Sequence, residues 1–461
     1  MAPHQHTQGT STQGLFASVF IACFAVALFM SLILPLFGFS ATWGGLGHDG
    51  YLELGRNILA GNGFRFSPDG PPAFHRPPLF PTLIAPLTVF GETGQKVGIA
   101  LVNSLFVAIA CYYVHRTALL LFSHHTVANA AIVLLLLNPW LHRLISSPLS
   151  AVMQMALFTA VCFYMLRLIV HVDTIRMYSW RQTFWSGLRL SPLFVAFCYA
   201  HGTSFYICMV FLTLTVVASA AMRMWRVCGA AVLVGILTAT VLSPWALRNE
   251  AILDRLEPVT SGAGYTYFLS NQYWGVFDWS SGIDTDYNRA ALRAGGVTED
   301  PDKVMQYWGV IDPEADATLR QSMLDHIKTN PLELVQKAVL SFADILFPVT
   351  HVVWCKSVGA SGYCPTTLDE YQTASRVART LYMLAIVGMA IASVWCGMRQ
   401  ALWAPAAACA LALFHTVPYW PIATYAHHGI YSLGSLPLLN VLAAATLVRL
   451  WRAQRPVTVA L

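Results

Sequence analysis

Long runs of apolar residues dominate the chain, and short polar segments separate them. A membrane-spanning helix needs about 20 mostly apolar residues, and ten stretches reach or approach that length. The predicted spans are Leu15–Phe39, Val97–Phe122, Thr126–Ile145, Leu149–Val170, Phe184–Ala200, Thr203–Ala221, Val227–Ala246, Val377–Met398, Ala401–Trp420 and Ile430–Leu450. The first has a long apolar core with no Lys or Arg before it, which predicts an uncleaved anchor. The pattern therefore predicts an all-α polytopic membrane protein with about ten transmembrane helices.

An eleventh apolar stretch, Leu332–Trp354, contains several charged and polar residues and is a poor lipid-facing span. The positive-inside rule can decide whether it crosses, because cytoplasmic loops carry an excess of Lys and Arg. If it does not cross, the basic residues of four segments fall on one side: Arg176 and Arg181, Arg223 and Arg226, Arg399, and the C-terminal arginines. We therefore expect ten crossings with both termini in the cytoplasm, and a helix at Leu332–Trp354 that lies at the outer interface.

This layout divides the chain into five parts. The predicted parts are a cytoplasmic N-terminus at 1–14, a transmembrane module at 15–247 that includes a first outer loop at 40–96, a large extracytoplasmic loop region at 248–376, C-terminal transmembrane helices at 377–450, and a cytoplasmic tail at 451–461. Of the 22 acidic residues, 21 fall in the two outer regions. The need for solubilising charge explains the larger region well and the first loop less well. The pattern favours aqueous chemistry on the extracytoplasmic side.

Composition supports the membrane assignment and excludes several classes of protein. Hydrophobic residues make up 56% of the chain and charged residues only 11%, whereas soluble domains carry about 25% charged residues. A soluble enzyme, a coiled coil and a disordered protein are therefore excluded. The net charge of +5 comes without a dense Lys/Arg cluster, so nucleic acid is not an expected partner.

Cysteine usage is consistent with this layout. Eight of the ten cysteines lie in predicted spans, where Cys behaves as a small hydrophobic residue. The other two, Cys355 and Cys364, share the large outer loop. An oxidising compartment permits a disulfide between them, and we expect one.

The first outer loop carries the strongest candidate for catalysis. It reads HDGYLELGRNILAGNGFRFSPDGPPAFHRPPLFPTLIAPL, and Asp49 comes about ten residues after the first span. Asp49 is therefore expected close to the outer membrane surface, where it could share one cavity with His48, His75 and Arg76. The simpler interpretation is that Asp49 is an ordinary solvated loop acid.

The pattern also predicts the local structure of this loop. Tyr51–Ala60 is typical of a short interfacial helix, which Gly61 and Gly63 would end. The proline-rich piece Pro77–Pro86 returns the chain to the membrane. Prolines are tolerated there if the piece is buried in protein or lies at the interface.

The seventh span ends in LSPWALRNEAI, which places Arg248 and Asn249 at the mouth of the helix. An Arg side chain presents a planar fork of donors that suits phosphate. An arginine that merely anchors the helix at the interface is the simpler alternative. Further along, TSGAGYTYFLSNQYWG contains Asn271 and Trp274, and its aromatic rings could stack on a sugar, although loop packing also explains them. His201, at the outer end of the fifth span, could equally be functional or a helix-end residue.

Recognisable metal and nucleotide motifs do not occur. The sequence has no HExxH, Walker A or GxSxG motif and no pattern of soft metal ligands. Asp49 with a second carboxylate could bind a hard divalent cation, so a metal stays open as a cofactor and the sequence does not name one.

Taken together, these pieces resemble the GT-C superfamily of integral membrane glycosyltransferases. The similarity is to the bacterial branch that is like the protein O-mannosyltransferases and includes the aminoarabinose transferases. Five motifs follow in the matching order: HDGYLELGRNILAGNGF, RPPLFP, PWALRN, SGAGYTYFLSNQYW and TNPLELVQKAVLSFADILFP. The resemblance extends from about Phe16 to Leu450.

The resemblance implies a sugar donor on polyprenyl phosphate and a lipid, glycan or protein acceptor at the extracytoplasmic face of a bacterial cytoplasmic membrane. It implies that Asp49 is the catalytic residue. The residues implied to bind the donor phosphate are His75, Arg76 and Arg248, and those expected to contact substrate are His48, Tyr51, His201, Asn249, Asn271 and Trp274. Only one clear carboxylate is visible, which favours inversion at the anomeric carbon, because retention by double displacement needs a second, nucleophilic carboxylate.

Three segments depart from the pattern of the superfamily. The fourth span opens with ISSPLSAVMQ and lacks the expected acid, the fifth is followed by AHGTS rather than an Arg-Pro, and HHGIYSLGSLP lacks an Arg before the last span. These losses leave the donor open, and a member without activity is one interpretation. Two rival functions also stay open: a ligase or polymerase of lipid-linked glycans, which would share the outer loop, and a transporter. Transporters often show internal repeats, and none is visible here.

Overall fold

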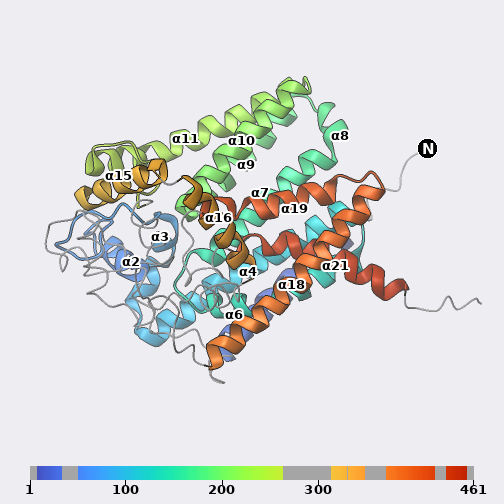
Figure 1. Ribbon diagram of the computed structural model, residues 1–461, viewed down its shortest axis with the longest axis horizontal. Coiled ribbons are helices and arrows are strands. Elements are labelled where there is room, and N and C mark those ends of the chain that lie inside the picture. Colours follow the sequence, from blue (N-terminus) through green and yellow to red (C-terminus); the bar gives the residue numbers. More distant parts are fainter. Residues whose placement is uncertain are drawn as a thin grey trace, which may run out of the picture.

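The structure, a computed structural model, describes residues 8–33, 50–262, 313–329, 331–347, 370–420 and 432–453. Within these ranges the regular elements are all helical, and the single β-type contact is an isolated antiparallel bridge between Arg65 and Pro72. The predicted all-α class is therefore confirmed for the described part of the chain (Figure 1).

The described chain forms helices of very different lengths, from short turns to helices of about 30 residues. Residues 8–176 form α1 (Gln8–Ile33), α2 (Tyr51–Leu59), α3 (Leu79–Ile84), the 3₁₀ helix η3 (Ala85–Val89), α4 (Glu92–Phe122), α5 (His125–Leu136), α6 (Pro139–Ile145), α7 (Ala151–Val170) and α8 (Val172–Arg176). Residues 180–453 form α9 (Trp180–Ala200), α10 (Gly202–Ala221), α11 (Trp225–Leu253), α15 (Pro313–Thr329), α16 (Pro331–Leu346), α18 (Glu370–Arg399), α19 (Ala404–Phe414), η5 (Val417–Tyr419) and α21 (Leu436–Ala453).

Six of the described helices are long and apolar enough to cross a membrane. They are α4, α7, α10, α11, the part of α18 from Val377, and α21. Apolar helices of 10–17 residues lie at Ala17–Ile33, Leu79–Val89, His125–Leu136 and Ala404–Tyr419. These helices identify an integral, multi-pass membrane protein. The total of ten crossings stays a prediction.

The third predicted span is wrong as a continuous helix. The structure divides it into α5 and α6, with a turn at Leu137 and Asn138 just before Pro139. A residue that precedes proline is pushed out of the helical region, and the proline nitrogen has no hydrogen to donate. The helix therefore stops and restarts.

The ninth predicted span is also shorter than a full crossing. Helix α19 ends at Phe414, and a 3₁₀ turn follows. The reason is again a proline: Pro418 cannot donate the hydrogen bond that the carbonyl of Phe414 would accept in a continued helix.

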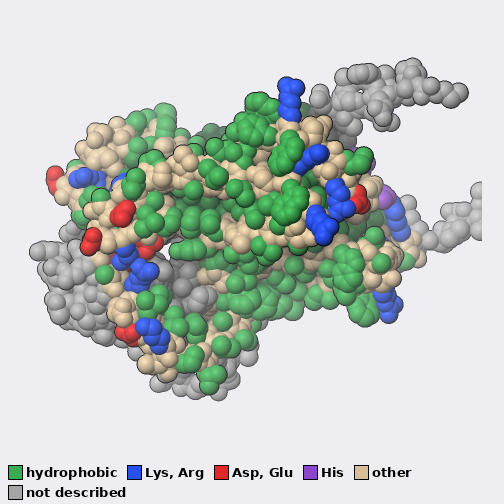
Figure 2. All heavy atoms as spheres, turned by 90° about the horizontal axis from the view of Figure 1, so that it is seen from above, with side chains coloured by type: hydrophobic (Ala, Val, Ile, Leu, Met, Phe, Trp, Pro, Cys, Tyr) green, Lys and Arg blue, Asp and Glu red, His purple; other side chains and the backbone are tan. Residues whose placement is uncertain are grey.

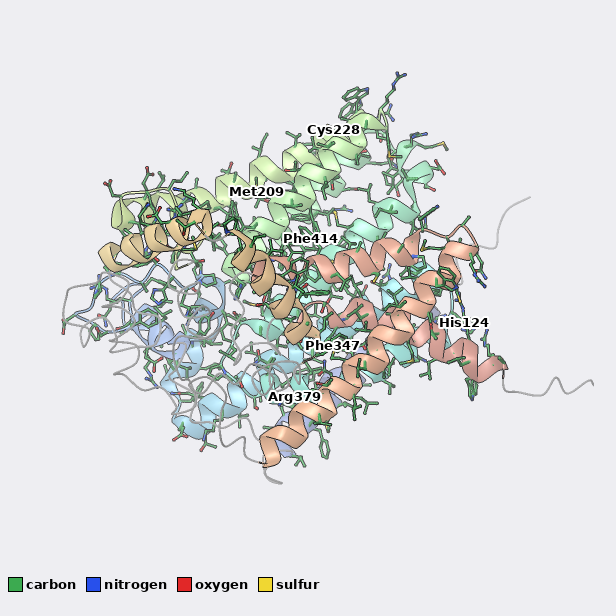
Figure 3. The ribbon with its side chains drawn as sticks, viewed as in Figure 1. His124, Met209, Cys228, Phe347, Arg379 and Phe414 are labelled. Carbon is green, nitrogen blue, oxygen red and sulfur yellow. The ribbon has the colours of Figure 1, made fainter. Side chains whose placement is uncertain are left out.

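The helices bury two apolar clusters around α21. The C-terminal helix α21 packs against α4, α5 and α18, so helices far apart in the sequence share one core (Figure 1). In the second cluster α19 meets α10: Phe414 lies in the centre of the molecule (Figure 3), and its ring centroid is 5.4 Å from that of Phe211. Buried carbonyls are satisfied across helices as well. The amide nitrogen of Asn103 in α4 donates to Ile145 (2.8 Å) and Ser147 (2.9 Å), which fixes the end of α6.

Charge lies at the two ends of the molecule. Hydrophobic side chains cover most of the middle of the face in Figure 2, and Lys, Arg, Asp and Glu gather toward either end. One end carries α2, α3 and α15, and the other carries α8 and the end of α21 (Figure 1). This distribution suits helices that cross a bilayer, and which end faces outward stays a prediction.

Candidate functional site

The helix expected after the first-loop acid is confirmed. Helix α2 spans Tyr51–Leu59, and Gly61 (φ +78°) and Gly63 (φ +82°) follow it in the left-handed conformation that favours glycine. Gly50 precedes the helix with φ +67°. A Cβ atom at Gly50 would lie 2.1 Å from Cε1 of Phe66. The conformation and the surroundings of position 50 therefore both favour glycine.

Tyr51 anchors the start of α2 in the bundle. Its side chain is buried, its ring packs edge-on against Phe80 with centroids 5.3 Å apart, and its hydroxyl lies 3.2 Å from that of Ser150 at the start of α7. The guanidinium carbon of Arg76 lies 5.5 Å from the centroid of the Tyr51 ring. The structure thus brings Tyr51 and Arg76 together.

Arg248 binds backbone carbonyls of the loop segment 64–76. Its guanidinium donates to the carbonyl oxygens of Phe64 (3.2 Å) and Ala73 (2.8 Å) and to Oδ1 of Asn249 (3.0 Å). It also stacks over Trp245, with the guanidinium carbon 4.5 Å from the ring centroid. Arg248 is therefore close to the loop that carries Arg76, and part of its donor fork already has protein partners.

Asn249 organises the chain after α11. It is fully buried, and its amide nitrogen donates to the carbonyls of Glu257 and Val259 at 3.1 Å each. Trp245 donates to the same Val259 carbonyl at 2.7 Å. In the described structure Asn249 therefore fixes a turn, which the sequence reasoning did not anticipate.

His75 lies in an aromatic environment beside Arg76. Its ring stacks on Phe66 (centroids 5.2 Å apart, planes 17° apart) and meets Phe74 edge-on at 5.5 Å. Both ring nitrogens are buried and have no hydrogen-bond partner among the described residues. Burial, together with the charge of Arg76, holds the pKa of His75 well below its usual range. The imidazole is therefore neutral at pH 7.

Arginines concentrate around the loop segment 64–76. Arg65 and Arg76 belong to this segment, and Arg248 donates to the carbonyls of Phe64 and Ala73 within it. With Arg76 beside His75, three cations surround one short segment, and such an arrangement favours binding of an anion.

A buried polar network lies beside Tyr51 and was missed by the sequence reasoning. Nε2 of Gln154 donates to the hydroxyl of Tyr419 (2.8 Å) and to Ser204 (3.2 Å), and the Tyr419 hydroxyl lies 2.7 Å from that of Thr203. His201 joins through Nδ1, which lies 2.9 Å from the Thr203 hydroxyl. The network ties α7, α10 and η5 together.

One signal in the sequence pointed toward this network. Gln154 is a polar residue inside a predominantly apolar predicted span, where polar side chains are rare and usually face a partner in the bundle. Tyr419 gave no signal, because an aromatic residue at the end of a span is typical of a membrane interface. Only the fold brings residues 154, 203 and 419 together.

Several predicted site residues lie outside the described residues. These are His48, Asp49, Asn271, Trp274, Cys355 and Cys364. Their predicted roles, including the disulfide, stay predictions. Within the described ranges no group of three or more His, Cys, Asp or Glu side chains could hold a metal ion.

The fold and this site describe a multi-pass helical membrane protein with a basic, aromatic-lined loop at one end of the bundle. No protein-family model matches the chain, and no curated protein sequence matches it. Among solved structures it is similar to the crystal structure of ArnT from Cupriavidus metallidurans in the apo state. The identity is 15%, the match covers 95% of this chain and 78% of that chain, and the TM-score is 0.33. A TM-score below 0.5 is too low for this likeness to carry an argument about fold or function.

Proposed function

We propose that the protein is an integral membrane glycosyltransferase that moves a sugar from a polyprenyl-phosphate donor to an acceptor at the extracytoplasmic face of a bacterial cytoplasmic membrane. The observation that carries the proposal is that Arg65 and Arg76 lie in the loop segment 64–76, next to the start of α2, and that Arg248 binds the backbone of the same segment. Asp49 is separated from Tyr51 only by Gly50. This concentration of positive charge next to the start of α2 supports a phosphate-binding role beside the carboxylate of the sequence.

The proposed reaction is a single displacement. An acceptor hydroxyl attacks the anomeric carbon, the bond from that carbon to the phosphate oxygen breaks, and the lipid phosphate leaves with the bonding electrons. Asp49 takes the proton of the hydroxyl, and this help is worth ~10²–10⁴-fold in rate. One carboxylate acting as a base inverts the configuration of the anomeric carbon.

Arg76 and Arg248 have different roles in the proposed reaction. Arg76, stacked over Tyr51, supplies charge to the departing phosphate. Arg248 adds to the positive field and holds the loop through the carbonyls of Phe64 and Ala73. Fixed donors and charges aimed at a developing anion stabilise a transition state because they need not reorganise during the reaction.

The neutral His75 suits a different partner from phosphate. A neutral imidazole offers one donor and one acceptor. Sugar hydroxyls can accept from the first and donate to the second, whereas an ionised phosphate oxygen only accepts. In this proposal His75 and Tyr51 contact the donor beside its phosphate, and His48, His201, Asn249, Asn271 and Trp274 line or support the substrate site.

Mass spectrometry of the lipid and glycan fractions of a deletion strain tests the proposal. We expect one glycosylated species to disappear and a polyprenyl-phosphate sugar to accumulate, and the wild-type gene to restore both. An unchanged set of glycans and lipid-linked sugars would contradict the proposal.

A further inference from the structure

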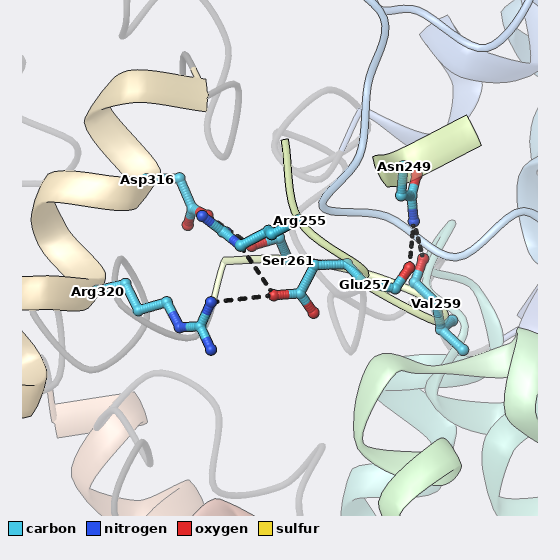
Figure 4. Close-up of polar contacts among 7 residues, drawn as sticks. All are labelled: Asn249, Arg255, Glu257, Val259, Ser261, Asp316 and Arg320. Carbon is cyan, nitrogen blue, oxygen red and sulfur yellow. Dashed lines mark hydrogen bonds and ion pairs between the residues drawn. The ribbon is translucent and has the colours of Figure 1, made fainter. Parts of the chain in front are cut away.

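Helix α15 belongs to the large outer loop region, yet it is tied to the chain that follows α11 by a cluster of charged residues (Figure 4). Asp316 of α15 pairs with Arg255 and accepts a hydrogen bond from Ser261. Arg255 also pairs with Glu257 (3.1 Å), and Arg320 of α15 pairs with Glu257 at 3.6 Å. Two cations and two anions from the two segments therefore balance one another.

Three of the four charged side chains in this cluster are largely shielded from water, and Arg320 is exposed. The side chain of Asp316 is 1% exposed, that of Glu257 13% and that of Arg255 19%. Exposed ion pairs contribute little to stability, but the loss of one partner of a buried pair leaves an uncompensated charge. Asp316 is thus the residue that fixes α15 to this segment most firmly.

The segment held by Asp316 reaches the candidate site directly. The backbone N–H of Ser261 donates to the carbonyl of Phe74 at 3.1 Å. A Cβ atom at Gly262 would lie 3.5 Å from Cβ of His75. One residue further on is Arg76, whose guanidinium lies over Tyr51.

The same segment also touches the helix that begins beside His201. Thr260 packs so closely on Gly202 that a Cβ atom at position 202 would lie 2.2 Å from its hydroxyl oxygen. Residues 255–262 therefore run from α15 across the start of α10 to the loop at Phe74.

We infer that α15 is a positioning element for the candidate site: the Asp316–Arg255–Ser261 cluster sets the place of Phe74, and through it of His75 and Arg76. Asp316 acts through other residues and is a positioning residue. The effect of Asp316 on sugar transfer rests on the proposed function. The structural coupling between α15 and residues 74–76 does not.

Hydrogen exchange of the full-length protein in detergent, read by mass spectrometry, tests the coupling without any substrate. Asp316→Asn keeps the shape of the side chain and removes its charge. Loss of a hydrogen bond to a charged group lowers the local stability. Hydrogen exchange should therefore become about 10-fold faster at the Ser261 amide and in residues 73–76. The matched control is Asp325→Asn on the same helix, because Asp325 is exposed and pairs with Lys328 at 3.7 Å. Exchange at the Ser261 amide and in residues 73–76 should not change in this control.

A second variant covers the case in which Asp316→Asn fails to fold. Ser261→Ala leaves the Arg255–Asp316 pair intact and removes only the contacts of the Ser261 hydroxyl with Arg255 and Asp316. Exchange in residues 73–76 should be faster than in wild type, by a smaller factor than in Asp316→Asn. Normal exchange there in Ser261→Ala, or an Asp316→Asn effect confined to residues 313–329, would overturn the inference.

A transfer assay with a polyprenyl-phosphate sugar then separates the two proposals. Asp316→Asn should raise the KM for the donor several-fold with a smaller change in kcat, because Arg76 is displaced and the base is not. Faster exchange with unchanged donor KM would uphold the coupling and contradict the proposed role of Arg76.

Discussion

At the scale of single residues, Gly50 and His75 show how much the local chemistry of the loop is constrained. Gly50 lies so close to the ring of Phe66 that no side chain fits at position 50, and the ring of His75 stacks on the same phenylalanine. The position of Gly50 after the candidate acid was visible in the sequence. Its contact with Phe66 was not, because that contact depends on how residues 50–66 fold back on themselves.

We expect Gly50→Ala to destabilise the protein more than Gly61→Ala. Both glycines are left-handed, so each substitution costs about 1–2 kcal/mol. At Gly50 the new methyl group also overlaps Phe66, whereas at Gly61 nothing lies within 4 Å. Overpacking adds about 1–3 kcal/mol. Unfolding in detergent measures the difference, and equal losses for the two variants would contradict the close contact.

His75 should make stability depend on pH. Its pKa in the folded protein lies well below the unfolded value of about 6.5, so the unfolded chain binds the proton more readily as the pH falls. This contribution to stability is present above pH 6.5 and is lost below it. The free energy of unfolding should fall by about 1.4 kcal/mol more in wild type than in His75→Phe between pH 7.5 and 5.5. Parallel pH profiles would mean that His75 protonates freely in the folded protein.

At the scale of elements, the apolar pattern predicted most of the long helices, but it missed α15 and did not show where helices stop. The sequence predicts Tyr51–Ala60, and α2 covers Tyr51–Leu59. The breaks before Pro139 and around Pro418 were missed because hydropathy averaged over a long stretch hides the loss of one backbone donor. The role of Arg248 was missed for another reason: its carbonyl partners lie more than 170 residues earlier in the chain.

Replacement of Arg248 by Lys should separate its structural role from that of Arg76. The guanidinium reaches Asn249 from one nitrogen and Phe64 and Ala73 from another, and the single nitrogen of an ammonium group cannot occupy both places. A buried acceptor left without a donor costs about 1–3 kcal/mol. Arg248→Lys should therefore lower the free energy of unfolding. Arg76→Lys should leave stability unchanged and raise the KM for the donor, because charge remains but the fork geometry is lost. If Arg248→Lys is as stable as wild type, the holding role assigned to it is wrong.

At the scale of the whole molecule, composition predicted a polytopic membrane protein, and the positions of the acids bear on its sidedness. The contacts between distant segments are visible only in the fold. The sequence could indicate that loop 40–96 and region 248–376 share one side. It could not indicate that Gln154, Thr203 and Tyr419 would meet beside Tyr51, because polar residues in separate helices carry no mark of a common partner. Such contacts depend on helix packing.

The predicted sidedness can be measured by labelling single cysteines with an impermeant thiol reagent in a Cys355→Ser/Cys364→Ser background. A cysteine at the exposed position Asp325 of α15 should react from outside. One at the exposed Arg176 of α8 should react only after the membrane is permeabilised. The reverse pattern would overturn the layout. Labelling of the parent before and after reduction reports on the predicted Cys355–Cys364 disulfide.

The central claim is that the acid beside Gly50 activates the acceptor, and transfer by purified Asp49→Asn enzyme tests it most directly. The substitution keeps the shape of the side chain and removes the base, so transfer should fall by at least ~10²-fold, while donor binding should change much less. Asp69→Asn is the matched control, because Asp69 is an exposed acid in the same loop, and it should retain near-normal transfer. Near-normal transfer by Asp49→Asn would contradict the account, because Asp49 would then be an ordinary solvated acid.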